Sequence, residues 1–136
     1  MSKSRAVVLT PFDAVGKRVQ DTVRRALVDI GIEVIRLDDI RPGASWINAV
    51  SDAIRNSDFS IFDLSRHNPN VYYELGYAHS LRKPTILIIS IEAKKPIPSD
   101  LQGYLYITYD PSDLSGLRDR ITHVALQHIR RGGDDE

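Results

Sequence analysis

The feature that most constrains the fold is a repeated alternation between short apolar, β-branched runs and longer segments with helical periodicity. Short runs of this kind are typical of buried β-strands. The fourth is the most hydrophobic stretch of the chain, which suits a central parallel strand covered on both faces. The expected strands are Ala6–Leu9, Val34–Leu37, Phe59–Phe62, Thr85–Ile91 and Leu105–Tyr109.

Helical patterns separate these runs. Between the first two strands, apolar residues from Val15 to Ile30 recur at steps of three and four, as on one face of an amphipathic helix. Asp13 is a suitable N-cap for this helix and Gly31 a suitable end. A second helix is expected after Ser45 as its N-cap, a third from about Asn68 to Leu81, and a last one from about Ser112 to Ile129. A short turn near Leu101 is a fifth candidate.

Strands that alternate with helices predict a parallel sheet with right-handed helical crossovers. Five strands and about five helices predict a flavodoxin-like, doubly wound α/β/α sandwich with strand order 2-1-3-4-5. A length of 136 residues fits one domain. We place that domain at residues 1–131 and expect a disordered tail at 132–136.

Charge and composition exclude several classes of function. Lys and Arg together number 18 and so do Asp and Glu, a balance that disfavours a protein built to hold duplex nucleic acid. The absence of cysteine excludes disulfides and thiolate metal sites. No stretch reaches the roughly 18 apolar residues of a membrane span. We therefore expect a cytoplasmic protein with no membrane partner.

Cofactor and metal motifs are also missing from the sequence. No Gly-x-Gly-x-x-Gly follows the first strand, no phosphate-binding Walker loop is present, and the four histidines are scattered. These patterns would indicate a dinucleotide, a nucleoside triphosphate or a zinc ion. The sequence therefore predicts neither a resident cofactor nor a metal.

Ligands of doubly wound sheets bind beyond the carboxyl ends of the strands, near the point where the strand order reverses. This rule identifies the residues that should surround a site. They are Thr10, Pro11 and Phe12 after the first strand, Asp38 and Asp39 after the second, Asp63, Ser65, Arg66, His67 and Asn68 after the third, Ser90 and Glu92 after the fourth, and Asp110 after the fifth.

Carboxylates are abundant at this edge, and most have a plain structural explanation. Asp13 and Asp110 are good capping residues, and Glu92 belongs to a solvated loop. Glu74 lies near the start of the third helix, where two readings stay open: an exposed glutamate favoured by the helix dipole, or a functional group. Gly76, two positions later, is costly in a helix. A glycine there makes sense if another backbone or a ligand must come close.

The segment from Asn68 to Ala78 reads Asn-Pro-Asn-Val-x-Tyr-Glu-Leu-Gly-x-Ala and is followed by Lys83-Pro84. Together with the opening Val-Val-Leu-Thr-Pro-Phe, it resembles the nucleoside 2-deoxyribosyltransferase-like and TIR-like nucleotide-binding superfamily. The resemblance covers most of the chain, through about Ile91. It implies a flavodoxin-like fold with a cleft for a nucleoside or nucleotide.

The resemblance also implies roles for single residues. Glu74 matches a glutamate that acts at the N-glycosidic bond, as a nucleophile in the transferases and as the carboxylate that cleaves nicotinamide from NAD in TIR enzymes. Asp63 resembles an aspartate that contacts the base. Asn68 stands where the transferases usually carry a carboxylate, and Asn70 where TIR enzymes often have a small Ser or Cys.

The predicted function is therefore cleavage or transfer of an N-glycosidic bond, with Glu74 catalytic and NAD, if bound, as substrate rather than cofactor. A stacking role for Phe12, Trp46 or a tyrosine, and a phosphate contact for Arg66 or Arg41, complete the hypothesis. The expected substrate-binding residues are Thr10, Pro11, Phe12, Asp39, Asp63, Ser65, Arg66, Asn68, Asn70 and Tyr73.

Two alternatives remain at this stage. One is a non-catalytic nucleotide sensor of the same fold, and the other is a TIR-like signalling or interaction module. The expected partners are a nucleotide or nucleoside and further copies of the chain, because TIR-type catalysis commonly needs self-association.

Overall fold

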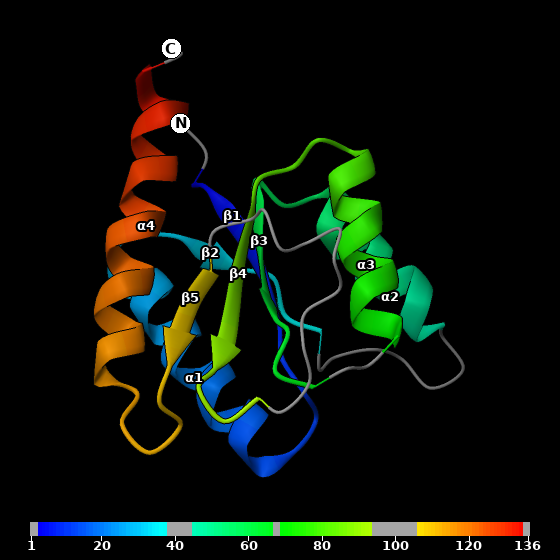
Figure 1. Ribbon diagram of the computed structural model, residues 1–136. Helices are drawn as coiled ribbons and strands as arrows, with labels where there is room; N and C mark the ends of the chain where they lie inside the picture. Colours follow the sequence, from blue (N-terminus) through cyan, green and yellow to red (C-terminus); the bar gives the residue numbers. More distant parts are fainter. Residues whose placement is uncertain (1–2, 38–44, 67–68, 94–105, 135–136) are drawn as a thin grey trace.

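The computed structural model describes residues 3–37, 45–66, 69–93 and 106–134. Strands and helices alternate along these segments as predicted (Figure 1). The elements are β1 (Arg5–Leu9), α1 (Ala14–Asp29), β2 (Glu33–Val34), α2 (Trp46–Arg55), β3 (Phe59–Asp63), α3 (Pro69–Ser80), β4 (Thr85–Ser90), β5 (Tyr106–Tyr109) and α4 (Ser115–Asp134).

The strands form one sheet in which every neighbouring pair is parallel. Their order is β2-β1-β3-β4-β5, which confirms the predicted flavodoxin-like topology. The order reverses at β1, which pairs with β2 on one side and with β3 on the other. The predicted site location at the carboxyl ends of these strands therefore has a defined place in the fold.

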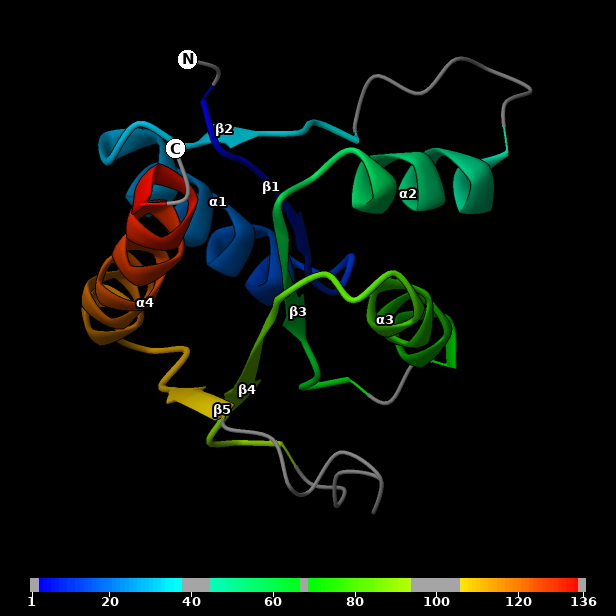
Figure 2. The same cartoon turned by 90° about the horizontal axis from the view of Figure 1, so that it is seen from above.

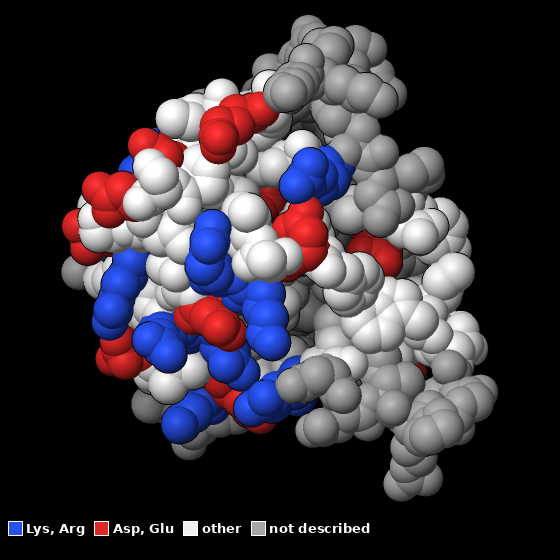
Figure 3. All heavy atoms as spheres, turned by 90° about the horizontal axis from the view of Figure 1, so that it is seen from below, with Lys and Arg blue, Asp and Glu red and all other residues white. Residues whose placement is uncertain are grey.

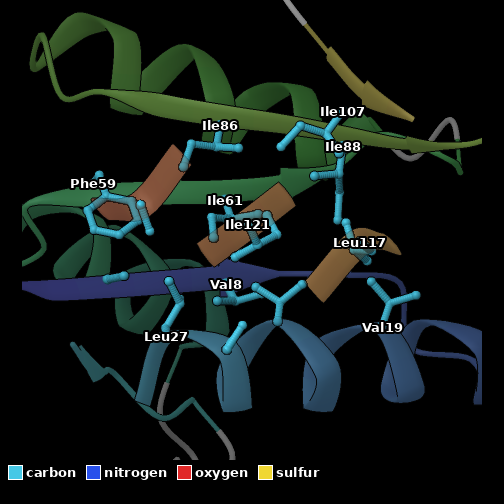
Figure 4. Close-up of a cluster of buried hydrophobic side chains, with 14 of the residues drawn as sticks. Val8, Val19, Leu27, Phe59, Ile61, Ile86, Ile88, Ile107, Leu117 and Ile121 are labelled. Atoms are coloured by element: carbon cyan, nitrogen blue, oxygen red, sulfur yellow. The ribbon is translucent and has the colours of Figure 1, made fainter. Parts of the chain in front are cut away.

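Helices cover both faces of the sheet, with α1 and α4 on one face and α2 and α3 on the other (Figure 2). The alternation of side chains along each strand divides the core accordingly. Val8, Ile61 and Ile88 pack toward α1 and α4 (Figure 4), whereas Val7 and Phe62 pack toward α2 and α3. The apolar runs of the sequence are thus explained by burial on both faces.

The predicted helix caps are confirmed. The Asp13 carboxylate accepts a hydrogen bond from the Gly16 N–H at 2.7 Å, and the Ser45 hydroxyl oxygen accepts one from Asn48 N–H at 3.3 Å. Each bond satisfies an N–H group that has no acceptor within its own helix. Gly31 follows α1 with φ of 87°, the left-handed conformation that favours glycine.

Several boundaries differ from the prediction. β2 covers only Glu33–Val34, because its ladder with β1 ends after two residue pairs. The last helix begins at Ser115 rather than near Ser112, because the carboxylate of Asp110 accepts hydrogen bonds from Ser112 and holds a separate turn. The expected turn near Leu101 lies outside the described residues.

The end of the last helix also differs from the prediction. α4 continues to Asp134, beyond the predicted end at Ile129, so the helix includes the backbone of residues 132–134. The two glycines of this segment are weak helix formers, but each residue added to an existing helix forms a further backbone hydrogen bond without a new nucleation step.

Gly16 fixes how the loop after β1 lies on α1. A Cβ atom at this position would come 2.0 Å from the carbonyl oxygen of Pro11, far inside van der Waals contact. Gly76 differs, because a Cβ atom there meets nothing within 4 Å. No described atom therefore approaches Gly76 closely, and a methyl group would fit at this exposed position.

We expect Gly16→Ala to lower the free energy of unfolding by roughly 1–3 kcal/mol, since the loop must shift to admit a methyl group. Gly76→Ala should raise it by about 0.5–1 kcal/mol, because alanine is the better helix former. Urea denaturation of both variants measures the difference. Equal stabilities for Gly16→Ala and the parent chain would contradict the close contact.

Candidate functional site

The carboxyl edge of the sheet carries a cleft of about 440 Å³. Binding sites for small molecules usually span roughly 300–1,000 Å³. Its wall is built from the start of α1, the segments after β3 and β4, and the end of β5. Of the residues predicted to surround a site, six line it: Pro11, Asp63, Ser65, Arg66, Ser90 and Glu92.

A buried hydrogen-bond network forms the floor of this cleft. Asp63 is fully buried, and its carboxylate accepts bonds from the Ser65 N–H at 2.9 Å, the Ser65 hydroxyl at 2.5 Å and the Tyr109 hydroxyl at 2.6 Å. The Ser65 hydroxyl oxygen accepts in turn from the Ser90 N–H at 2.7 Å. The ends of β3, β4 and β5 are therefore tied together by side chains.

Burial dominates the electrostatics of this network. It raises the pKa of Asp63 above its usual range, although the bonds from Ser65 and Tyr109 act in the opposite direction. Burial, followed by the hydrogen bond to Asp63, raises the pKa of the Tyr109 hydroxyl as well. Asp63 is thus engaged within the fold, whereas we had expected it to be a ligand contact.

Arg66 is paired across the mouth of the cleft. Its guanidinium donates to the Asp13 carboxylate, at 3.0 Å from Nε and 2.8 Å from a terminal nitrogen. The Gly16 N–H, and after it the Arg66 side chain, lower the pKa of Asp13. Arg66 therefore holds the start of α1 against the loop after β3, which competes with its expected role at a phosphate.

Several lining residues escaped the sequence analysis as site residues, and three of them carry polar side chains that matter for the site. Tyr109 ends β5 and lies against Asp63, while Asp13 and Arg18 reach the cleft from α1. The rule about strand ends, applied to the last residue of the fifth strand, would have identified Tyr109. Nothing in the sequence indicates that Arg18 turns toward the cleft.

Glu74 belongs to the other face of the sheet. Residues three and four positions apart share one face of a helix, so Glu74 lies on the same face as Tyr77 and Ala78. The Tyr77 hydroxyl accepts a bond from Arg55 of α2 at 3.4 Å, and Ala78 packs in the core beneath α2. Glu74 therefore faces α2, about one turn nearer to the carboxyl edge.

The carboxylate of Glu74 is half-buried and has no hydrogen bond or ion pair within the described residues. Burial alone raises its pKa from 4.5 to about 7, because no charge or donor compensates for the lost water. Glu74 does not line the cleft that Asp63 and Arg66 share. The carboxyl edge thus presents two separate polar regions, one on each face of the sheet.

Aromatic side chains lie exposed at this edge. Phe12 is 83% exposed and contacts Trp46, which begins α2, edge to face with ring centroids 5.3 Å apart. Tyr73 of α3 is 64% exposed. The rings of Phe12 and Tyr73 therefore remain accessible to a planar ligand, while Trp46 is less exposed, at 37%.

The other predicted residues have varied positions. The Thr10 hydroxyl donates to Gln20 of α1 at 3.1 Å, so it stabilises the loop after β1. Asn70 is exposed on the first turn of α3, and Asp110 holds its local turn. Asp39 and Asn68 lie outside the described residues, as do Asp38, Arg41 and His67.

Histidines and acidic residues of the described segments form no group that could hold a metal ion. His79 has a ring nitrogen 3.2 Å from the Thr85 hydroxyl, at the end of α3 remote from the carboxyl edge. None of the described helices combines the length and the apolar character that crossing a bilayer requires.

The raised pKa of Glu74 predicts a pH-dependent stability. Ionisation is disfavoured in the folded state, so stability is full below pH 4.5 and is lost as the pH rises to about 7. Glu74→Gln removes this cost and should be more stable than the parent chain at pH 8 by at most about 3 kcal/mol, with little difference at pH 4. Thermal unfolding across this range tests it.

Glu92→Gln provides the matched control for this measurement. Glu92 is exposed, so its substitution should change stability little at either pH. A stability difference for Glu74→Gln that is the same at pH 4 and pH 8 would show that the carboxylate is not desolvated.

Solved structures with a similar fold include enzymes and a receptor domain. The CMP N-glycosidase BcmB of Clostridium botulinum aligns with a TM-score of 0.62 and 22% identity over 85% of this chain and 97% of its own. The TIR domain of the Toll-related receptor TRR-2 of Hydra magnipapillata aligns with a TM-score of 0.67 and 20% identity over 93% of this chain and 99% of its own. The 2-deoxyribosyltransferase of Bacillus psychrosaccharolyticus aligns with a TM-score of 0.58 and 19% identity over 85% of this chain and 90% of its own.

At these identities the likeness concerns the fold alone. Curated proteins provide no match to the sequence. A family model described as TIR domain matches residues 14–121, which extend from the start of α1 into α4 and make up most of the chain. The resemblance noted from the motif around Glu74 is therefore confirmed at the level of the superfamily, and the chain belongs to the TIR domain family.

Proposed function

We propose that this protein cleaves or transfers the N-glycosidic bond of a nucleotide or nucleoside, with Glu74 as the catalytic carboxylate. The observation that carries the proposal is a half-buried carboxylate near the carboxyl edge that no described residue pairs, and whose pKa burial raises to about 7. Two proteins of similar fold support it, since one is named a CMP N-glycosidase and the other a 2-deoxyribosyltransferase.

The chemistry matches what a desolvated carboxylate can supply. When the bond between the anomeric carbon and the base nitrogen breaks, its electron pair leaves with the base and positive charge develops on the ribosyl ring. The Glu74 carboxylate stabilises this charge or captures the anomeric carbon covalently. Water or a second base then completes hydrolysis or transfer.

The remaining substrate contacts are proposals of the same kind. Phe12 is the exposed ring best placed to stack on a base, because Trp46 supports it from α2. Asn68 and Asn70 precede Glu74 on the same segment and offer amide groups to sugar hydroxyls. Asp63 acts indirectly in this scheme, by holding the ends of three strands.

Glu74→Gln should lower N-glycosidase activity by roughly 10²–10⁴-fold, because the amide cannot neutralise the developing charge. The assay incubates concentrated protein separately with NAD, with CMP, and with a deoxynucleoside plus a free base, and chromatography detects the released base. Glu33→Gln is the control, since Glu33 lies on β2, where its carboxylate pairs with Arg5 of β1. Turnover that survives Glu74→Gln would refute the proposed role.

The pH dependence of the reaction provides an independent check. If the ionised form of Glu74 is the active one, kcat/KM rises with pH and levels off above a midpoint of about 7. A profile with its midpoint near 4.5, the ordinary value for glutamate, would mean that another carboxylate does the chemistry.

A second candidate function is an interaction module that assembles through the same edge. Large apolar side chains are exposed here on three segments, with Phe12 83%, Ile47 52% and Tyr73 64% exposed. Contiguous exposed apolar surface commonly marks a binding face. Light scattering at increasing protein concentration tests self-association, and Phe12→Ser should weaken it if this face is the interface.

A further inference from the structure

We propose that the cleft between α1, β3, β4 and β5 is a second ligand site, separate from Glu74, that binds a sugar phosphate. The cleft of about 440 Å³ is lined by α1, which packs on the opposite face of the sheet from α3. Glu74 is not among the described residues that line this cleft. The proposal therefore does not depend on the proposed function of Glu74.

The rim formed by α1 offers free donors to an anion. Arg18 lines the cleft, and within the described residues its exposed guanidinium has no hydrogen-bond or ion-pair partner. The first intrahelical bond of α1 runs from the Lys17 N–H to Asp13, and Asp13 also caps Gly16. The N–H groups of Ala14 and Val15 therefore remain without acceptors in the helix.

Two of the three acidic residues that line the cleft are engaged by neighbouring donors. Asp13 is neutralised by Arg66 through two close contacts, and Asp63 is buried beneath donors from Ser65 and Tyr109. Figure 3 shows this end of the molecule, where Lys and Arg side chains gather on the half formed by α1 and α4, with Asp and Glu side chains among them. The third, Glu92, belongs to the segment after β4, away from α1, and Arg18 is the lining cation that the described residues leave unpaired, so an anion is favoured beside Arg18.

The opposite rim favours hydroxyl groups. Glu92 is exposed, with no described partner for its carboxylate, and the Ser90 hydroxyl oxygen beside it accepts only from the Glu92 N–H. A carboxylate and a hydroxyl are suitable partners for the hydroxyl groups of a sugar. A ligand with a phosphate at one end and hydroxyls at the other matches both rims, which is the chemistry of a pentose phosphate.

The test measures binding of ribose 5-phosphate, ribose and inorganic phosphate to the full chain by isothermal titration calorimetry. We expect ribose 5-phosphate to bind most tightly, because only it reaches both rims. Arg18→Gln should weaken its binding about tenfold or more, as loss of a charge-assisted hydrogen bond does. Arg25→Gln, an exposed arginine of α1 outside the cleft, should leave binding unchanged.

Glu74→Gln separates this site from the proposed catalytic one. Binding of ribose 5-phosphate that survives Glu74→Gln but falls with Arg18→Gln supports a second site, whether or not any N-glycosidase activity is found. Loss of binding with Glu74→Gln would place the ligand between α2 and α3 and overturn the proposal. So would the absence of binding to the parent chain, equal affinity for ribose, or equal effects of Arg18→Gln and Arg25→Gln.

Discussion

The burial of one carboxylate organises the carboxyl edge of this protein. Asp63 ends the central strand β3 with no exposed surface, and a buried carboxylate is tolerated only where donors surround it. Ser65 and Tyr109 supply those donors, and Ser65 extends the network to Ser90 at the end of β4. The parallel ladder sets the strand order, but these bonds fix how three strand ends meet.

Three carboxylates near this edge show how environment separates one chemical group into different roles. Asp13 caps a helix, and the Gly16 N–H, followed by the Arg66 side chain, lowers its pKa. Asp63 is fully buried, and burial raises its pKa despite good hydrogen bonds. Glu74 is half-buried without such bonds, and its pKa rises to about 7. Of these three, Glu74 is the one that combines partial access with a charge that no described residue pairs, which is typical of functional groups.

Sequence reasoning recovered the architecture because each strand and helix carried its own local signal. Apolar runs buried on both faces, caps at Asp13 and Ser45, and the glycine after α1 follow from short-range chemistry. The rule about strand ends then placed Pro11, Ser65 and Arg66 at one edge. These three residues do line the same cleft.

The side-chain pairings could not be read from the sequence in the same way. Asp63 and Tyr109 are separated by 46 positions in the sequence. No local pattern reveals which acceptor a tyrosine side chain will find. The pairing of Arg66 with Asp13 was missed for this reason. The late start of α4 depended on Asx turns at Asp110 and Asp113, which compete with helix formation.

The desolvation of Glu74 is costly for folding and, on the proposed function, useful for catalysis. In the free protein, burial removes part of the water around its charge and no cation of the described residues replaces that water, so ionisation is disfavoured. A ribosyl ring that acquires positive charge next to this carboxylate removes that penalty. The attraction is weak while the substrate is neutral at the anomeric carbon and strong only as the bond breaks. An interaction that strengthens toward the transition state accelerates the reaction, whereas an ion pair already present in the fold would have used the same charge before substrate arrived.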